Sequence, residues 1–549
     1  MPRKGAVIAA YAIALLLAPY LLCAEEPQPD QVAGRIISAL DGHPLPHATI
    51  TLTALPSEKV FATALSGDDG LFHFDAVPAG KYRMTGNAAN YFSAAYLAHG
   101  QYSTAIVTGA GLATDSLELQ LDPISSISGH VLDNGEPVEH AAITLYREDP
   151  DSTERITRRQ VVQTDDDGAY NFNRVPPGRY FLAANATPWY AIHPPFEPEG
   201  SQPPFRLAVD PALDVAYPLV FYPDALDPSG ASPITLHGGE QITADMQMHP
   251  QHAMTLTVRV PSDDKQNNRI APQLTRSIFG EDEPVFYQNV SNAGNGAITI
   301  SGIPPGVYSL QDVGANGLIA HSRSVNLTGA SASLDDAAPS ETASVTVSVH
   351  MAPGVSLPKQ AQLNLRGIQS DRATAGKLNE KGVAEFPNIP PGDYRFAFLG
   401  SSKPVNVLAF AVDGKPVEDK RLHIAGAGHA VVELTVSLGS FEIDGFVKRD
   451  GKSIAGSLVA LVPAGGDTNA ELFRRDQSDL DGSFSFYNVA PGNYIVIAME
   501  NGPDLRSTDL RWTDVPTITP YLLHGLPVSV PTTGPAAIRL TDSVDDQHR

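Results

Sequence analysis

The sequence predicts an all-β protein, a tandem array of about five β-sandwich modules that follow a signal peptide. The first observation is a short motif that occurs five times without any insertion. The second is the alternation of apolar and polar residues within each copy, which is typical of a strand with one buried face. The third is the near absence of apolar residues at helical spacing. The fixed spacing of the repeated motif indicates one structural unit used several times. The copies are Gly70–Tyr82, Gly168–Tyr180, Gly296–Tyr308, Gly382–Tyr394 and Gly482–Tyr494.

Each copy of the motif contains a turn, a strand, a corner and the start of a second strand. In the second copy an aspartate precedes Gly168, and Asp or Asn before glycine favours a turn with the glycine at positive φ. Apolar residues then alternate along Tyr170–Val175. The two prolines of the corner Pro176–Gly178 lack a backbone N–H donor and have a fixed φ, so the strand ends there. Tyr180 opens the next strand, and we expect its ring on the core side.

The length of the chain and the spacing of the motif predict the domain organisation. A chain of 549 residues has room for about four to six domains of ordinary size. The second module carries an additional segment, 188–233, that is rich in proline and aromatic residues. The predicted divisions are a signal peptide at 1–24 and modules at 25–124, 125–250, 251–342, 343–438 and 439–549.

Modules one, two and five open with the same strand, turn and strand. In the second module these are Ile127–Val131, Asn134-Gly135 and Ala141–Leu145. Modules three and four keep only the outline, in Leu256–Val260 and Val345–Val349. Most modules end in two short strands that lead straight into the next module. Such short connections predict a semi-rigid rod.

The first 24 residues have the composition of a secretory signal peptide. Met1–Lys4 is basic, Ala6–Leu22 is apolar, and Ala24 is a small residue at the expected cleavage site. An uncleaved anchor is the first alternative, because the apolar run approaches membrane-spanning length. A lipoprotein acylated at Cys23 is the second. Cys23 is the only cysteine, so we expect no disulfide and no thiol chemistry in the mature chain. No later segment is apolar enough to cross a membrane, so we also expect no transmembrane segment after cleavage.

The charge of the chain limits its partners. It has 37 basic and 61 acidic residues, a net charge of −24 that is spread along the sequence. This balance disfavours nucleic acid and anionic membrane surfaces, since both would be repelled. Solubility alone also accounts for such a charge.

The repeated motif resembles that of the carboxypeptidase regulatory-like domains. The shared pattern is Gly-x-aromatic-x-Phe followed by Val/Ile-Pro-Pro-Gly-x-Tyr, after a strand with an internal glycine. The resemblance covers most of residues 30–540 and implies prealbumin-like, Ig-like sandwiches of the carbohydrate-binding-like group. The stretch Tyr217–Asp224 also resembles one found in tandem exported bacterial proteins of this type. In metallocarboxypeptidases the similar domain is the non-catalytic partner, so the resemblance implies no activity.

Two patterns in the sequence have metal-ligand spacing. His237-Gly-Gly-Glu240 spells the His-x-x-Glu of a zinc carboxypeptidase. However, it falls in a terminal hairpin where other modules also have glycines, which favours a turn. The acidic turns at Asp68-Asp69, Asp165–Asp167 and Asp479–Asp481 could bind calcium, although Asp before Gly is ordinary turn chemistry. We expect no metal ligand, no catalytic residue and no cofactor.

The aromatic residues of segment 188–233 are the candidate ligand-binding residues. They could form a stacking platform for sugar rings. Alternatively, they cover one end of the sandwich. The residues are Trp189, Tyr190, Tyr217, Phe221 and Tyr222.

These observations favour an exported, non-enzymatic binding and scaffold protein of the bacterial cell envelope or exterior. Its location would be periplasmic, on the cell surface or secreted, and its partner an unidentified protein or polysaccharide. A carbohydrate-binding protein that uses the aromatic residues of module two is the alternative. A secreted metallo-hydrolase is a third possibility, but no nucleophile, metal site or carboxylate pair has supportive spacing.

Overall fold

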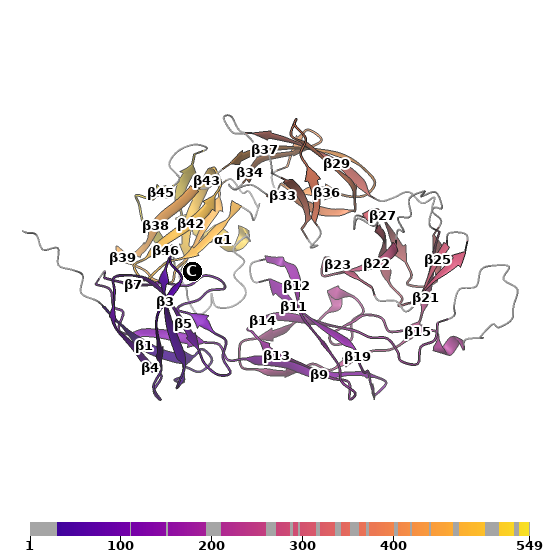
Figure 1. Cartoon of the computed structure of the whole chain (residues 1–549), viewed down its shortest axis with the longest axis horizontal. Coiled ribbons are helices and arrows are strands. Elements are labelled where there is room, and N and C mark those ends of the chain that lie inside the picture. The colour runs from indigo at the N-terminus through magenta and orange to yellow at the C-terminus, as the bar shows by residue number, and fades with distance from the viewer. Residues whose placement is uncertain are drawn as a thin grey trace, which may run out of the picture.

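A computed structural model of the chain consists almost entirely of β-strands arranged as five sandwiches (Figure 1). The exceptions among the described elements are α1 (Val515–Leu522) and two short 3-10 helices, Pro211–Leu213 and Pro228–Gly230. The predicted signal peptide lies outside the described residues. The structure describes residues 30–109, 111–149, 152–193, 210–259, 271–285, 289–294, 297–313, 319–334, 342–351, 362–368, 373–399, 405–417, 420–438, 441–464, 472–499, 515–531 and 537–547.

The first module packs two sheets around one core. Its strands are β1 (Asp30–Ser38), β2 (Thr49–Leu55), β3 (Lys59–Leu65), β4 (Leu71–Val77), β5 (Gly80–Asn87), β6 (Ala94–Ala95), β7 (Ile106–Thr108) and β8 (Leu117–Leu121). One sheet has the order β4-β1-β8, and the other has the order β3-β2-β5-β6 with β7 beside β5. Ile36 and Phe72 of the first sheet and Ile50 and Met84 of the second are buried together between them.

The second module has the same two-sheet arrangement with additional short strands. Its strands are β9 (Ser125–Asp133), β10 (Glu136–Pro137), β11 (Ala142–Asp149), β12 (Ser152–Gln163), β13 (Ala169–Val175), β14 (Gly178–Asn185), β15 (Val215–Ala216), β16 (Val220–Phe221), β17 (Ile234–Leu236), β18 (Gln241–Thr243) and β19 (Met246–Gln247). One sheet is β10-β9-β13 with β18 and β19 on β9, and the other is β12-β11-β14-β16 with β17 on β14. The segment 188–233 supplies β15 and β16, so part of it belongs to the sandwich. β15 pairs with β20 (Gln251–His252), at the start of the passage to module three.

Modules three and four are also two-sheet sandwiches. Module three contains β21 (Met254–Arg259), β22 (Ala271–Ile278), β23 (Glu281–Pro284), β24 (Asn289–Gly294), β25 (Ala297–Ile303), β26 (Val307–Val313), β27 (Ile319–Asn326) and β28 (Ala332–Leu334), in the orders β24-β25-β21-β28 and β23-β22-β26-β27. Module four contains β29 (Ala343–Met351), β30 (Gln362–Gly367), β31 (Ala373–Lys377), β32 (Val383–Ile389), β33 (Gly392–Leu399), β34 (Val405–Val412), β35 (Lys415–Pro416), β36 (Leu422–Ile424) and β37 (Gly428–Leu438), in the orders β32-β29-β37-β34-β35 and β31-β30-β33-β36.

In the fifth module the last strand links the two faces. Its elements are β38 (Phe441–Arg449), β39 (Lys452–Ser453), β40 (Leu458–Pro463), β41 (Arg474–Gln477), β42 (Ser483–Val489), β43 (Gly492–Met499), α1, β44 (Leu526–Val530), β45 (Ala537–Arg539) and β46 (Val544–Gln547). Because β46 pairs with both β38 and β43, the two faces form one nine-stranded sheet. Ile518 and Tyr521 of α1 pack against Ile497 and Met499, outside the main core.

A close parallel pairing explains the glycine inside the first strand of modules one and two. In every module the first strand pairs in parallel with a strand from its end. A Cβ at Gly34 would lie 2.1 Å from the carbonyl oxygen of Leu117, and one at Gly129 would lie 2.3 Å from that of Ala244. Only glycine lets the two backbones approach this closely.

The tyrosine that ends each motif makes the same hydrogen bond in all five modules. Its phenol hydroxyl donates to the backbone carbonyl four residues earlier, at the start of the corner. The donors are Tyr82, Tyr180, Tyr308, Tyr394 and Tyr494, with O–O distances of 3.1, 2.7, 2.5, 2.8 and 2.9 Å. All five tyrosines are buried, which confirms the prediction that their rings face the core. Each one therefore ties the corner to the core of its module.

A β-bulge within the motif strand was not predicted. Just before the corner, one residue has positive φ and the register with the first strand shifts. The five residues are Ala76, Arg174, Gly302, Asn388 and Asn488. Gly302, Asn388 and Asn488 are of types that favour positive φ, but Ala76 and Arg174 are not, so the five copies share no residue pattern that predicts the bulge. The turn glycines 70, 168, 382 and 482 do have the predicted positive φ, whereas Gly296 lies outside the described residues.

A buried hydroxyl distinguishes modules one, two and five. Thr164, four residues before the turn glycine, accepts the N–H of Ala141 at 2.8 Å and donates to the carbonyl of Val138 at 2.6 Å. Ser66 and Ser478 make the equivalent pairs of bonds in modules one and five. Modules three and four have Asn292 and Leu378 at this position. The hydroxyl satisfies two buried backbone groups that hold the module's opening strands together.

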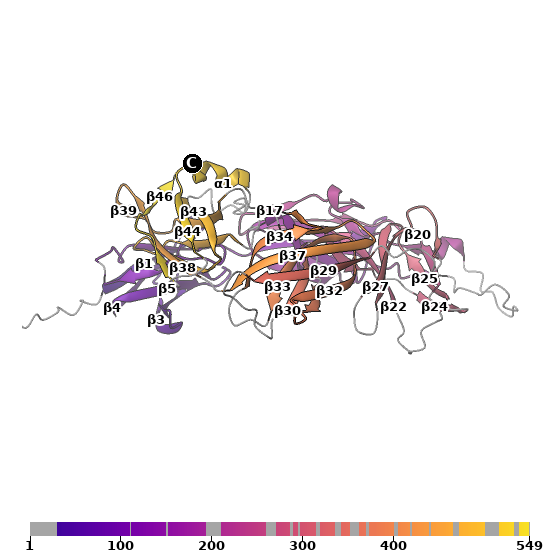
Figure 2. The ribbon, with the colours of Figure 1, turned by 90° about the horizontal axis from the view of Figure 1, so that it is seen from above.

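The modules are arranged in a closed ring, so the predicted rod is wrong. In Figure 1 the fifth module returns to the first, and in Figure 2 these two modules lie together at one end of the array, with the third at the other. Lys81 of the first module contacts Asp479 of the fifth, which is 398 residues away, at 2.6 Å. Short connections limit the reach of each joint, but side-chain contacts between modules decide its angle.

Candidate functional site

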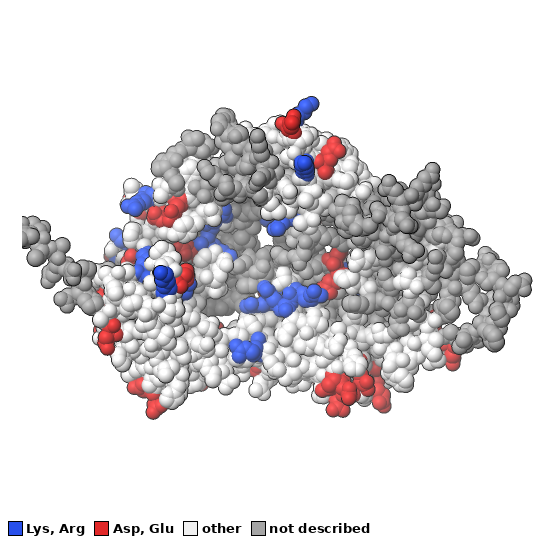
Figure 3. All heavy atoms as spheres, in the orientation of Figure 1, with Lys and Arg blue, Asp and Glu red and all other residues white. Residues whose placement is uncertain are grey.

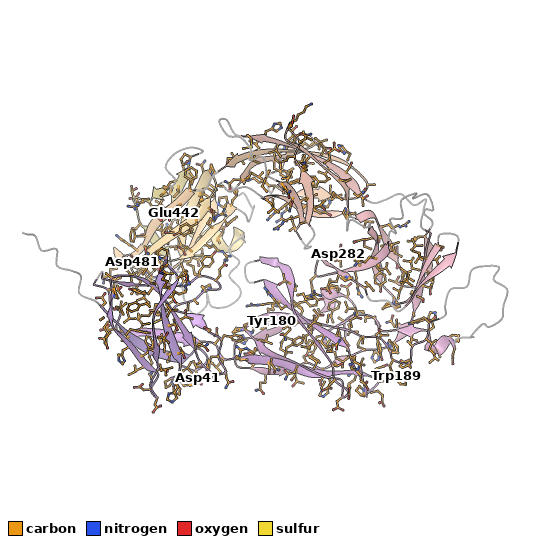
Figure 4. All side chains as sticks on the ribbon, in the orientation of Figure 1. Asp41, Tyr180, Trp189, Asp282, Glu442 and Asp481 are labelled. Carbon is orange, nitrogen blue, oxygen red and sulfur yellow. The ribbon has the colours of Figure 1, made fainter. Side chains whose placement is uncertain are left out.

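Trp189 is the most exposed large hydrophobic side chain in the described part of the chain. It lies in the loop after β14 and is 94% exposed, on the outer side of the second module (Figure 4). A turn in which the N–H of Ala191 donates to the carbonyl of Pro188 holds the loop. The ring of Tyr190 packs edge-on against the indole, with the centroids 5.7 Å apart and the planes at 89°. The indole therefore stands almost entirely in water, with the ring of Tyr190 as its aromatic neighbour.

Polar side chains lie beneath this aromatic pair. Tyr217 lies close to Tyr190, and its hydroxyl donates to Oδ2 of Asp133 at 2.7 Å. Burial, together with Asp133, raises the pKa of Tyr217, so that hydroxyl stays a donor. Asn134 donates from Nδ2 to Oδ1 of Asp133 at 2.9 Å, and His249 Nδ1 lies 4.0 Å from the same oxygen. We call Trp189, Tyr190, Tyr217, Asp133, Asn134 and His249 the aromatic cluster.

The structure brings together three of the five predicted ligand-binding residues and separates the other two. Trp189, Tyr190 and Tyr217 belong to the aromatic cluster, although Tyr217 is only 4% exposed and acts from below. Phe221 is fully buried in β16, on the far face of its sheet, and Tyr222 packs against the core of the second module. Sequence reasoning missed Asp133, Asn134 and His249, because they reach the cluster from β9 and from the region after β19.

Phe221 belongs to the contact between modules two and three. Phe279 of module three packs against the rings of Tyr146, Phe181 and Phe221, with centroid distances of 5.2, 5.1 and 5.5 Å. Tyr146 also donates a 2.9 Å hydrogen bond to Oε1 of Glu283. Burial raises the pKa of Tyr146, and the charge of Glu283 raises it further. Part of the segment 188–233 therefore holds the third module in place.

His237 and Glu240 lie in the turn between β17 and β18, which pair with β14 and β9 in different sheets, so the predicted terminal hairpin is wrong although the turn is present. The Glu240 carboxylate accepts the backbone N–H of His237 at 2.9 Å and that of Gly238 at 2.6 Å. Burial favours the protonated acid, but these hydrogen bonds outweigh it and lower the pKa of Glu240. Both carboxylate oxygens are thus occupied within the turn, as the turn interpretation predicts. Among the described residues, no group of three or more His, Cys, Asp and Glu side chains is placed to hold a metal ion.

The surface carries both signs of charge. Figure 3 shows acidic groups at the margins of the face drawn and a group of basic side chains in its middle, where β12 and β14 lie. Arg158 and Arg159 of β12 are exposed there. The net charge of −24 is therefore not evenly spread over this face.

Comparison with known families supports the predicted resemblance. The sequence model of the carboxypeptidase regulatory-like domain matches residues 31–112 and 126–192, in the first and second modules. No curated protein matches the sequence. The domain match and the succession of sandwiches fit a non-catalytic multi-module scaffold. In the part of the chain that the structure describes, no helix has the length and apolar character to span a bilayer.

Several solved structures of bacterial proteins are similar to parts of the chain. The TIE protein of Bacillus anthracis has 14% identity and a TM-score of 0.16, with 71% of this chain and 68% of that one covered. A minor pilin of Streptococcus agalactiae has 12% identity and a TM-score of 0.21, with 42% and 99% covered. The major pilin subunit of Bacillus cereus has 9% identity and a TM-score of 0.14, with 74% and 99% covered.

Proposed function

We propose that this chain is an exported, non-catalytic binding protein of the bacterial cell envelope or exterior. The aromatic cluster of the second module is its binding surface, and the other modules are its scaffold. The observation that supports this most is the exposed indole of Trp189 beside the ring of Tyr190. A tryptophan ring in water forgoes a large hydrophobic gain, and such anchors are enriched at binding surfaces. The residues of the repeated motif, in contrast, form the turns, corners and cores of the modules.

Carbohydrate is the second, more specific candidate for the ligand. The flat face of an indole stacks on the apolar face of a sugar ring, and neighbouring polar groups bind its hydroxyls. Asn134 and the exposed side chain of His249 lie beside Asp133 and offer donors and acceptors, whereas the Asp133 carboxylate is already bound by Tyr217 and Asn134. This arrangement favours a neutral or basic glycan, because the Asp133 carboxylate would repel an acidic one.

Glycan-array binding of the mature chain tests the carbohydrate candidate. Trp189→Ala should abolish glycan binding while leaving the fold intact, because the side chain is 94% exposed. Tyr487→Ala removes an aromatic ring that is 61% exposed in the fifth module and serves as the matched control. If wild type binds no glycan, or if the Trp189 variant binds as wild type does, carbohydrate is not the ligand of this surface.

The broader proposal has its own test, which does not depend on the ligand class. Wild-type chain should capture a component of its own envelope fraction, and Trp189→Ala should lose that component while Tyr487→Ala keeps it. Capture that is equal in all three proteins would refute the aromatic cluster as the binding surface. Export is tested by N-terminal sequencing of the mature chain, which should begin at Glu25.

A further inference from the structure

A polar contact that we call the clasp joins the first and fifth modules. In the fifth module it consists of Gln477–Leu480 with Ser483, and in the first of Lys81, Leu97, Thr104 and Ala105. Gln477 Nε2 donates to Thr104 Oγ1 at 2.8 Å, and Thr104 Oγ1 donates to the carbonyl of Ser478 at 3.1 Å. The N–H of Leu480 donates to the carbonyl of Ala105 at 3.0 Å. The side chain of Leu480 packs against the core of the first module.

Asp479 is the charged centre of the clasp, and both of its carboxylate oxygens bind the first module. Oδ2 accepts from Lys81 Nζ at 2.6 Å, and Oδ1 accepts the N–H of Ala105 at 2.9 Å. Lys81 also donates to Ser483 Oγ at 2.7 Å. The side chain of Asp479 is 18% exposed and that of Lys81 41%. The labelled Asp481 marks this junction in Figure 4.

In modules two and four, the residue equivalent to Asp479 binds backbone groups of its own turn instead of another module. In module two, Oδ1 of Asp165 accepts the N–H groups of Asp167 and Ala169, within its own turn. In module four, Oδ1 of Asn379 does the same with Lys381 and Val383. In module five this role passes to Asp481, which accepts from the N–H and Oγ of Ser483. The carboxylate of Asp479 is thereby released from its turn and directed to another module.

The two sides of the clasp are different surfaces that meet because each is complementary to the other. Such a heterologous contact can close within one chain or form between chains. Its described contacts are mostly polar, which is typical of contacts that open and close. Lys81 and Asp479 are 398 residues apart, so local chain geometry does not force them together.

We infer that the clasp is also an interaction surface for a second copy of this chain, with the fifth module of one copy docked on the first module of another. Within one chain the contact benefits from a high effective concentration, on the order of 1 mM for tethered groups. Closure within one chain therefore dominates in dilute solution. Exchange between chains becomes comparable when the local protein concentration approaches that value, as in a dense surface layer.

A charge exchange tests this inference directly. Lys81→Asp places a second negative charge next to Asp479, and Asp479→Lys places a second positive charge next to Lys81. Because like charges repel, neither variant should form the clasp within its own chain. When the two variants are mixed, the fifth module of each meets an opposite charge on the first module of the other. Light scattering should therefore show a twofold mass in the mixture only, while each variant alone is monomeric and more extended in small-angle X-ray scattering.

Controls separate the clasp from general effects of charge. The double variant Lys81→Asp, Asp479→Lys restores opposite charges and should be more compact than either single variant, although a lysine side chain at 479 cannot accept the N–H of Ala105. Lys59→Asp and Asp166→Lys change exposed charges by the same amounts outside the clasp and should stay closed. The inference is overturned if the mixture remains monomeric at 0.1 mM (roughly a tenth of the effective concentration) or if the single variants stay compact.

A second measurement needs no variant at Lys81 or Asp479. Wild-type chains that carry either a donor or an acceptor dye are mixed, concentrated to about 1 mM and then diluted. Energy transfer between chains should appear in the concentrated sample and decay after dilution. Its absence at high concentration would contradict exchange between copies, even if the substituted chains fail to fold.

Discussion

Removing one tyrosine hydroxyl should cost very different amounts in two modules, although the hydrogen bond is the same. In the fifth module, Tyr494 donates at 2.9 Å to the carbonyl of Ala490, and that residue is only 1% exposed. Tyr494→Phe leaves this acceptor where water does not reach it, which costs about 2–3 kcal/mol. In the second module, Tyr180 donates at 2.7 Å to Pro176, which is half-buried. Water can replace the hydroxyl there, so Tyr180→Phe costs about 1 kcal/mol.

Hydrogen exchange of the full chain, followed by mass spectrometry, measures each module separately. Amide exchange in β43 should accelerate by about 30–150-fold in Tyr494→Phe, because 1.4 kcal/mol corresponds to a factor of ten. Exchange in β14 should accelerate by only about 5-fold in Tyr180→Phe, by the same conversion. The other modules serve as internal controls in each variant. Equal accelerations, or a larger one in β14, would refute the argument from acceptor burial.

Three further predictions concern other parts of the chain. Phe279→Ala removes a half-buried ring that contacts three others, so it should weaken the joint between modules two and three by about 2–3 kcal/mol, which faster amide exchange in both β11 and β22 would reveal. Thr164→Val leaves the N–H of Ala141 and the carbonyl of Val138 unpaired and should destabilise module two by about 2–3 kcal/mol in the same assay, with no change in β43. Burial raises the pKa of Asp476 to about 6. Since the carboxyl is then protonated in the folded but not in the unfolded state between about pH 4 and 6, its contribution to stability is lost as the pH rises through this range. Asp476→Asn should therefore gain stability relative to wild type from pH 4 to pH 7, by at most about 3 kcal/mol, and a constant difference in calorimetry would contradict this.

The predicted binding site shows how far sequence reasoning reached. The concentration of aromatic residues in 188–233 predicted a binding site there, which stays a prediction, and the structure places Trp189 and Tyr190 side by side in that segment. The same pattern could not tell these residues from Phe221, which is buried against the third module. Aromatic side chains occur both in exposed binding platforms and in buried contacts between modules. Only the position of the neighbouring module distinguishes the two uses.

The sequence alone determined the five-fold repetition, the turn at the four described motif glycines, the strand and the corner, because these depend on residues that are neighbours in the chain. An Asp-Gly pair or a Pro-Pro-Gly corner acts on its own backbone wherever the module lies. Tertiary structure decided the bulge before each corner, the acceptor of each tyrosine and the direction of the Asp479 side chain. It also turned an expected rod into a ring, through contacts such as Lys81 with Asp479 and Phe279 with Phe221. These contacts join residues far apart in the chain, and their formation depends on how whole modules are oriented, which no local pattern encodes.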